Sequence, residues 1–293
     1  PERWRGRWAE ACWPGIGAVE PGAPRYREVR LDLGCGKGAF AVEAARRESD
    51  VLFVAMDSEP ICVAYAAQRV HESGLPNVVV VPGTGMRVRE FFSPGELGRI
   101  YLNFPTPFPR KRDAGKRMAS MERLMDFRDV LAQGAEVRLR TDSQPLFDFM
   151  LTQVPLAGYE LLWASRDARA ERPDEPSSEY EERLGAQGAR VLALSATPGP
   201  APKRVVQTAE LSLAAYLPHD LESLEALSYA PHGMEATVTN LRNRALRTAA
   251  RREGPAADAP PARLGSKVVG PNTRAPSAPP YSEKRHHAQH IRR

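Results

Sequence analysis

The chain is poor in cysteine and has no long apolar run. Its three cysteines, Cys12, Cys35 and Cys62, are an odd number at wide spacings without a CxxC pair. This pattern excludes a disulfide framework and a zinc-ribbon site, and it is typical of a reducing cytoplasm. No stretch approaches the ~20 apolar residues that a membrane-spanning helix needs. We therefore expect a cytoplasmic protein, because the arginines and tryptophans of residues 3–8 also lack the apolar core of a signal peptide.

Acidic residues are scarce at the C-terminal end. From Leu241 to Arg293 there are 12 Lys/Arg and three Asp/Glu, whereas the other 240 residues carry 29 basic and 33 acidic side chains. A basic tail on a mildly acidic body favours a polyanionic partner, with nucleic acid as the best fit and a merely solvated tail as the alternative. Histidines 286, 287 and 290 could bind a metal, but a basic terminus without a metal-binding role is favoured, so no metal site is expected.

Strand and helix signals alternate from Glu28 onward. Strands are expected at residues 29–33, 51–56, 78–81, 100–102, 136–140, 159–163 and 191–194, and helices at residues 39–47, 61–73, 118–131 and 147–151. Near-continuous apolar strands, each followed by a helix, predict an α/β fold with a doubly wound parallel sheet and helices on both faces. Ligands of such a sheet bind at the carboxyl ends of its strands.

Four regions are expected along the chain. Residues 1–27 form an N-terminal segment in which Trp4, Trp8 and Trp13 would make a stripe that docks on the core. Residues 28–197 form the α/β domain. Residues 198–253 form an uncharacterised extension, with a strand and short helix at 205–217 and a basic helix at 235–252. Residues 254–293 form a basic tail that is rich in proline, a composition that predicts disorder.

A glycine-rich turn follows the first expected strand. In Asp32-Leu33-Gly34-Cys35-Gly36-Lys37-Gly38 the alternate glycines permit positive φ and close backbone approach to a ligand, and the next helix points its free amides at the turn. The pattern is GxGxG and not the GxGxxG of dinucleotide binders. Asp32 favours a ligand with an ammonium group, and Asp57 after the second strand would accept hydrogen bonds from a ribose. Together they predict an S-adenosylmethionine site. A structural turn with two incidental acids is the alternative, and Cys35 is interpreted as a packing residue.

A proline-rich loop follows the fourth expected strand. Its sequence is Asn103-Phe104-Pro105-Thr106-Pro107-Phe108-Pro109, and Arg110-Lys111-Arg112 and Lys116-Arg117 come next. Three prolines make the loop rigid, so it would hold side chains over the methyl group of the cofactor. The basic cluster beside it is placed to bind phosphates.

These motifs resemble those of the bacterial tRNA (guanine-N7-)-methyltransferases. The signature is Arg99-Ile100-Tyr101-Leu102-Asn103-Phe104-Pro105-x-Pro107 with its basic continuation, joined to the glycine loop. Further agreement comes from Gly74-Leu75-Pro76-Asn77-Val78, Thr141-Asp142, Arg166-Asp167 and Glu179-Tyr180-Glu181. The resemblance spans Arg27 to Ala196. It implies a Rossmann-like class I methyltransferase that transfers a methyl group from S-adenosylmethionine to N7 of guanine 46 in the variable loop of tRNA. We expect it to act as a monomer.

The resemblance also implies roles for matching positions. The cofactor would be bound by Asp32, Gly34, Gly36, Gly38, Asp57, Thr84 and Asn103. Catalysis would involve Asn103 and Thr106. The substrate would be bound by Arg110, Asp142, Ser178, Glu179, Tyr180 and Glu181.

The chain departs from the family pattern in two places. Thr106 stands where the family has aspartate, with Phe108 in place of tryptophan, and Thr84 lies where the family has an acid that contacts adenine. Guanine N7 carries a lone pair and no proton, so transfer to it needs orientation rather than a general base. A carboxylate at position 106 would stabilise the charge that develops on the base, whereas threonine offers one hydrogen bond. Slower chemistry is expected, and an inactive RNA-binding homologue or an exocyclic-amine methyltransferase are the alternatives.

Overall fold

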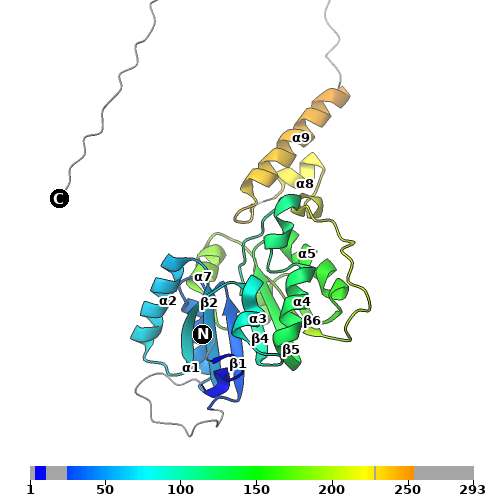
Figure 1. Ribbon diagram of the computed structural model, residues 1–293. Coiled ribbons are helices and arrows are strands. Elements are labelled where there is room, and N and C mark those ends of the chain that lie inside the picture. Colours follow the sequence, from blue (N-terminus) through cyan, green and yellow to red (C-terminus); the bar gives the residue numbers. More distant parts are fainter. Residues whose placement is uncertain (1–3, 11–24, 228, 254–293) are drawn as a thin grey trace, which may run out of the picture. The chain divides into compact units, whose positions relative to one another are not determined.

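The computed structural model describes residues 4–10, 25–227 and 229–253 of the protein (Figure 1). The described residues up to Arg252 belong to one compact unit. The expected tail at 254–293, its three histidines, Trp13 and Cys12 lie outside the described residues.

A seven-stranded sheet forms the centre of the unit. The strands are β1 (Glu28–Leu33), β2 (Val51–Asp57), β3 (Val78–Pro82), β4 (Leu97–Asn103), β5 (Leu131–Thr141), β6 (Tyr159–Ser165) and β7 (Leu192–Pro198). Their order is β3-β2-β1-β4-β5-β7-β6, and β7 is antiparallel to both of its neighbours. The predicted doubly wound α/β fold is confirmed, with β7 as the antiparallel strand in an otherwise parallel sheet.

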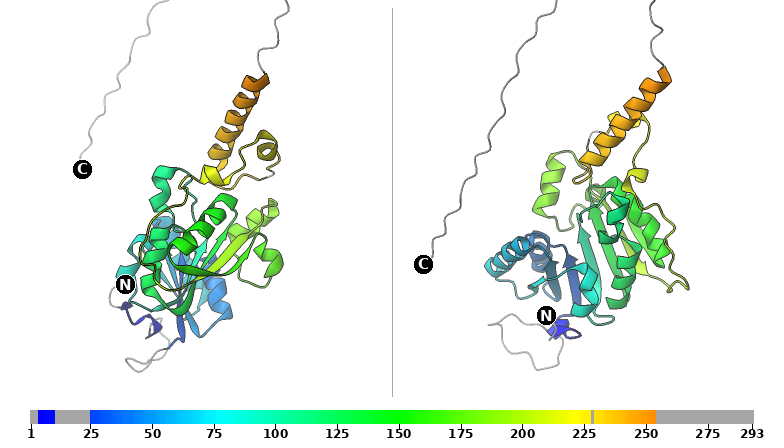
Figure 2. Two further views of the ribbon diagram at one scale, coloured as in Figure 1. Left: turned by 90° about the vertical axis from the view of Figure 1, so that its right-hand side faces the viewer. Right: turned by 45° about the horizontal axis from the view of Figure 1, so that its top comes forward.

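Helices cover both faces of this sheet (Figure 2). The longer ones are α1 (Ala39–Arg47), α2 (Pro60–Ser73), α4 (Met121–Val130), α5 (Gln144–Leu156), α7 (Glu179–Ala186) and α9 (Glu235–Glu253), and the short ones are α3 (Val88–Phe91), α6 (Ala168–Glu171) and α8 (Leu221–Glu225). Strand β2 shows why both faces are covered: Leu52 and Val54 join the core beneath α3, α4 and α5, whereas Val51 and Phe53 join the core beneath α1 and α2. Side chains alternate between the faces of a strand, so an entirely apolar strand must be buried on both.

Residues 4–10 of the N-terminal segment dock on the first of these cores, as expected for Trp4 and Trp8. Trp8 in the 3₁₀ helix η2 (Trp8–Glu10) is 3% exposed, and its indole N–H donates to the Phe91 carbonyl at 2.9 Å. The rings of Trp4 and Trp8 lie 6.5 Å apart. This segment therefore closes the face that carries α3.

The C-terminal extension packs on the domain through apolar side chains. Leu213 in η5 (Leu213–Tyr216) and Met234 before α9 are fully buried in the first core, and Leu224 in α8 is fully buried as well. The predicted basic helix is confirmed as α9. The predicted strand within 205–217 is wrong, because Val205 and Val206 are each 41% exposed and no neighbouring strand pairs with them. Among the described residues, no helix combines the length and apolar character needed to cross a membrane.

Candidate active site

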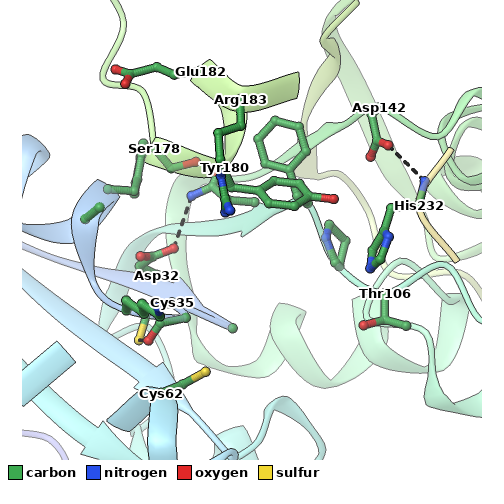
Figure 3. A pocket seen from close by; sticks show the side chains of 18 of the residues that line it. Asp32, Cys35, Cys62, Thr106, Asp142, Ser178, Tyr180, Glu182, Arg183 and His232 are labelled. Atoms are coloured by element: carbon green, nitrogen blue, oxygen red, sulfur yellow. Dashed lines mark hydrogen bonds between the residues drawn. The ribbon is translucent and has the colours of Figure 1, made fainter. Parts of the chain in front are cut away.

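A pocket of about 810 Å³ opens at the carboxyl ends of β1 and β4 (Figure 3). Strand order reverses between these two strands, and such a switch point leaves a crevice for ligands in a doubly wound sheet. Its lining includes Asp32, Gly34, Cys35, Gly36, Cys62, Asn103, Phe104, Thr106, Pro107, Asp142, Ser178, Tyr180, His232 and Gly233.

The glycine turn forms one end of the pocket. Gly34, Gly36 and Gly38 have φ of 76°, 54° and 76°, a region that side chains disfavour. A Cβ added at Gly34 or Gly36 would stand in open space, whereas one at Gly38 would lie 3.1 Å from Ala66. The first two glycines therefore leave the pocket clear, and Gly38 permits close packing of the α1 start on α2.

Asp32 and Asn103 meet beside this turn. The Asn103 Nδ2 donates to Asp32 Oδ1 at 3.1 Å, while Asp32 Oδ2 and Asn103 Oδ1 are buried without a partner among the described residues. Asp32 is 1% exposed, and its burial raises the pKa of the carboxyl to about 7, against the hydrogen bond from Asn103. A buried acceptor without a donor is costly, so this end of the pocket calls for a cationic or donating ligand.

The structure gives Asp57 and Thr84 local contacts outside the pocket lining. The two Asp57 oxygens accept from the backbone N–H groups of Gly36 and Glu59, each at 2.9 Å, so this carboxylate fixes the glycine turn. Thr84 caps η3 (Gly85–Arg87) by accepting from the Met86 N–H at 3.4 Å. Their predicted cofactor contacts stay predictions.

The proline-rich loop has two strained positions. Phe104 and Phe108 have φ of 50° and 46°, which is uncommon for bulky residues and costs of order 1–3 kcal/mol each. The fully buried Arg117 holds this conformation, because its guanidinium donates to the carbonyls of Pro107 and Phe108 and lies over the Phe149 ring at 4.7 Å. Burial lowers the pKa of Arg117 to about 10. Thr106, between the strained positions, is exposed and lines the pocket.

The basic cluster after the loop lies at the surface except for Arg117, whose predicted part in phosphate binding is wrong because its side chain is fully buried. Arg110 is exposed at the start of η4 (Lys111–Lys116) and does not line the pocket. Lys116 pairs with Asp113 at 2.9 Å, and Arg112 lies 3.8 Å from the same carboxylate. The substrate contact of Arg110 stays a prediction, and the structure places this residue outside the pocket lining.

Residues from β5 and α7 form the other end of the pocket. Asp142, just past β5, and Ser178 and Tyr180 line it, and the Tyr180 ring lies 5.2 Å from the Phe104 ring in an edge-to-face arrangement. Ser178 caps α7 by accepting from the backbone N–H of Glu181 at 3.2 Å.

The two other predicted substrate residues of this segment are Glu179 and Glu181 in α7. Glu181 is buried and accepts from Arg140 at 2.7 Å and from Arg169, so it anchors α7 to the sheet and does not line the pocket. Glu179 is the first residue of α7. Substrate binding by these two residues stays a prediction.

Three lining residues carried no functional signal in the sequence. Cys35 and Cys62 border the glycine end, and burial raises the pKa of both thiols, which makes them neutral packing groups. His232 lies between Asp142 and Thr106 and comes from the extension.

Comparison with known proteins decides the family. A family model described as "Putative methyltransferase" matches residues 26–194. The tRNA (guanine-N(7)-)-methyltransferase of Geobacillus kaustophilus is 32% identical over 201 residues, which cover 68% of this chain and 88% of that protein. The chain belongs to the tRNA (guanine-N(7)-)-methyltransferase family. The Lactiplantibacillus plantarum member is 32% identical over 162 residues, 55% of this chain and 76% of that one. Among solved structures, the 16S rRNA methyltransferase KamB is 22% identical and aligns with a TM-score of 0.48 over 60% of this chain and 90% of its own.

Membership makes this chain an S-adenosylmethionine-dependent methyltransferase, and its pocket fits that cofactor. The open glycine turn leaves room for the amino-acid part, and the unpartnered Asp32 Oδ2 would accept from its ammonium group. The region matched by the family model ends at residue 194, so the extension lies beyond it.

Proposed function

We propose that this enzyme methylates N7 of a guanine in tRNA. The observation that carries the proposal is the similarity to tRNA (guanine-N(7)-)-methyltransferases along 88% of one relative's length, joined to a pocket with a polar cofactor end and an open aromatic end. Guanine 46 of the variable loop as the target stays a prediction, as do a monomeric state and a cytoplasmic location.

One end of the pocket would bind the cofactor and the other end the target base. S-adenosylmethionine supplies an activated methyl group. Asp32, Gly34 and Gly36 would hold the amino-acid part of this cofactor at the glycine end. The proline-rich loop presents Thr106 at the opposite end, where the base would lie. Since N7 needs no deprotonation, orientation of the base is the main contribution, and a rigid, strained loop is suited to it.

Exposed arginines of α9 would hold the RNA outside the pocket. Arg244, Arg247 and Arg251 lie along the solvent side of this helix, and Arg110 lies beside the proline-rich loop. Contacts between such side chains and phosphates supply most of the affinity of a protein for nucleic acid without reading its sequence.

An assay with labelled cofactor and bulk unmodified tRNA tests the proposal. Nucleoside analysis of the product should show 7-methylguanosine. A methyl group on an exocyclic amine would instead favour the second candidate, which draws on the unpartnered Asn103 Oδ1 in the pocket as an acceptor for an amino group. Cofactor and tRNA binding without any methylated nucleoside would establish an RNA-binding homologue.

A further inference from the structure

The extension reaches into the pocket at its substrate end. The Tyr229 hydroxyl donates to Asp142 Oδ2 at 2.6 Å, and the His232 backbone N–H donates to the same oxygen at 3.2 Å. These contacts join residues 87 and 90 positions apart in the chain. Asp142, which is 9% exposed, therefore anchors the segment 229–233 on the domain.

Two further contacts fix the extension on the proline-rich loop. Gly233 lies against Pro107, since a Cβ there would meet the proline ring at 3.4 Å. The Leu213 N–H donates to the Pro109 carbonyl at 3.0 Å. The extension is thus attached to both elements that border the place of the base.

The His232 side chain completes a row of aromatic rings along the pocket. Its imidazole lies 6.5 Å from the Tyr180 ring, which in turn lies 5.2 Å from Phe104. The side chain is 77% exposed, and in Figure 3 it points toward Thr106. Its Nδ1 lies 3.5 Å from Oε1 of Glu235, the first residue of α9.

We propose that His232 is a base-contacting residue, and that its flat ring stacks with the target purine opposite the cofactor end. The inference rests on the proposed function. RNA-binding proteins receive unstacked bases on aromatic side chains, histidine included. Asp142 and Tyr229 then act as positioning residues that hold segment 229–233. The extension thereby contributes a residue to the substrate site.

Three substitutions at one position test the role of the ring. His232→Ala and His232→Gln should each lower kcat/KM for tRNA about tenfold, whereas His232→Phe should stay near wild type, because stacking needs a flat face and tolerates different rings. The dissociation constants for tRNA and for S-adenosylmethionine should change less than about twofold, since phosphate contacts dominate RNA affinity. His219→Ala, an exposed histidine of the same extension outside the pocket, is the matched control.

Several results would overturn the proposal. One is an active wild-type enzyme whose His232→Ala variant has the same kcat/KM. Another is an equal loss in all three variants together with a lower melting temperature, which would show a structural role. Tyr229→Phe should reduce kcat/KM less than His232→Ala does, and a larger loss would place the function in the hydroxyl and not in the ring.

A spectroscopic readout keeps this test separate from the activity assay. The imidazole carbon–proton signal of His232, identified by its absence in His232→Phe, should shift when bulk tRNA and S-adenosylhomocysteine are added. An unchanged signal with tRNA bound would overturn the inference. An inactive wild-type enzyme in which the signal still shifts would count against the proposed function alone.

Discussion

The two ends of the pocket are built in different ways. The cofactor end is formed where regular elements begin and end. Asp32 lies there, 1% exposed, beside three glycines of positive φ. The substrate end is made by loops, with an exposed Thr106 and a His232 that comes from an extension beyond the matched family region. A buried, rigid end suits a cofactor that is the same in every turnover. An end assembled from loops and an added segment is where the recognition of RNA can vary.

The largest expected effect comes from filling the cofactor end. In Gly36→Val a branched side chain would enter the open space above the turn, and S-adenosylmethionine affinity should fall more than about 100-fold, as for a blocked site. Gly74→Val is the matched control, because Gly74 also has positive φ (64°) and open space, yet caps α2 away from the pocket. Both variants should lose stability through backbone strain of about 1–2 kcal/mol. Calorimetry that shows equal cofactor affinity in the two variants would refute the assignment of this end.

Asp32→Asn tests the charge at the same end. A charged hydrogen bond contributes roughly 1.5–3 kcal/mol, so affinity should fall about 10- to 100-fold at pH 8. The pKa of Asp32 is raised to about 7 in the folded protein, so the wild-type carboxyl takes up a proton as the pH falls through 7. Protonation removes the partner of the ammonium group, and wild-type affinity should therefore decrease below pH 7, whereas the variant should show a flat profile.

The stability of the cofactor-free protein gives an independent check on Asp32. A carboxyl whose pKa is higher in the folded than in the unfolded state binds its proton more tightly when folded. Its ionisation above pH 7 therefore costs stability, and that cost fades as the pH falls toward the unfolded value of about 3.9. Asp32→Asn should be more stable than wild type above pH 7, with a difference that shrinks at lower pH. Melting curves with parallel pH dependence in both proteins would contradict the raised pKa.

The same contrast explains what could be predicted from the sequence. The glycine turn and Asn103 were identified because strand ends meet at one edge of a doubly wound sheet, and local sequence marks those ends. Asp57 is predicted to bind a ribose, and the structure adds that its oxygens accept from two backbone amides, contacts that the sequence does not reveal. His232 gave no signal at all, because its contacts with Asp142 span 90 residues and follow no periodic pattern.

The basic extension should contribute affinity without contributing to chemistry. Changing Arg244, Arg247 and Arg251 of α9 to glutamine should weaken tRNA binding about tenfold and flatten the slope of log K against log salt by about 2, as three lost phosphate contacts would do. Truncation after Asn240 should have a larger effect of the same kind, and truncation after Glu253 separates the contribution of residues 254–293. Cofactor affinity should not change in any of them. An unaltered salt slope in the triple variant would mean that α9 is merely solvated.

The smallest expected effect is a gain at the substrate end. Thr106→Asp places a carboxylate beside the base, where positive charge develops on the ring as the methyl group arrives. The interaction strengthens only in the transition state, so single-turnover rates on tRNA should rise several-fold, with little change in tRNA affinity. Thr106→Asn, of the same shape but uncharged, is the control and should give no gain. A rate increase in both variants would assign the benefit to a hydrogen bond and not to charge. If neither wild type nor Thr106→Asp forms 7-methylguanosine while both bind cofactor, Thr106 does not limit this chain, and the RNA-binding homologue becomes the better description.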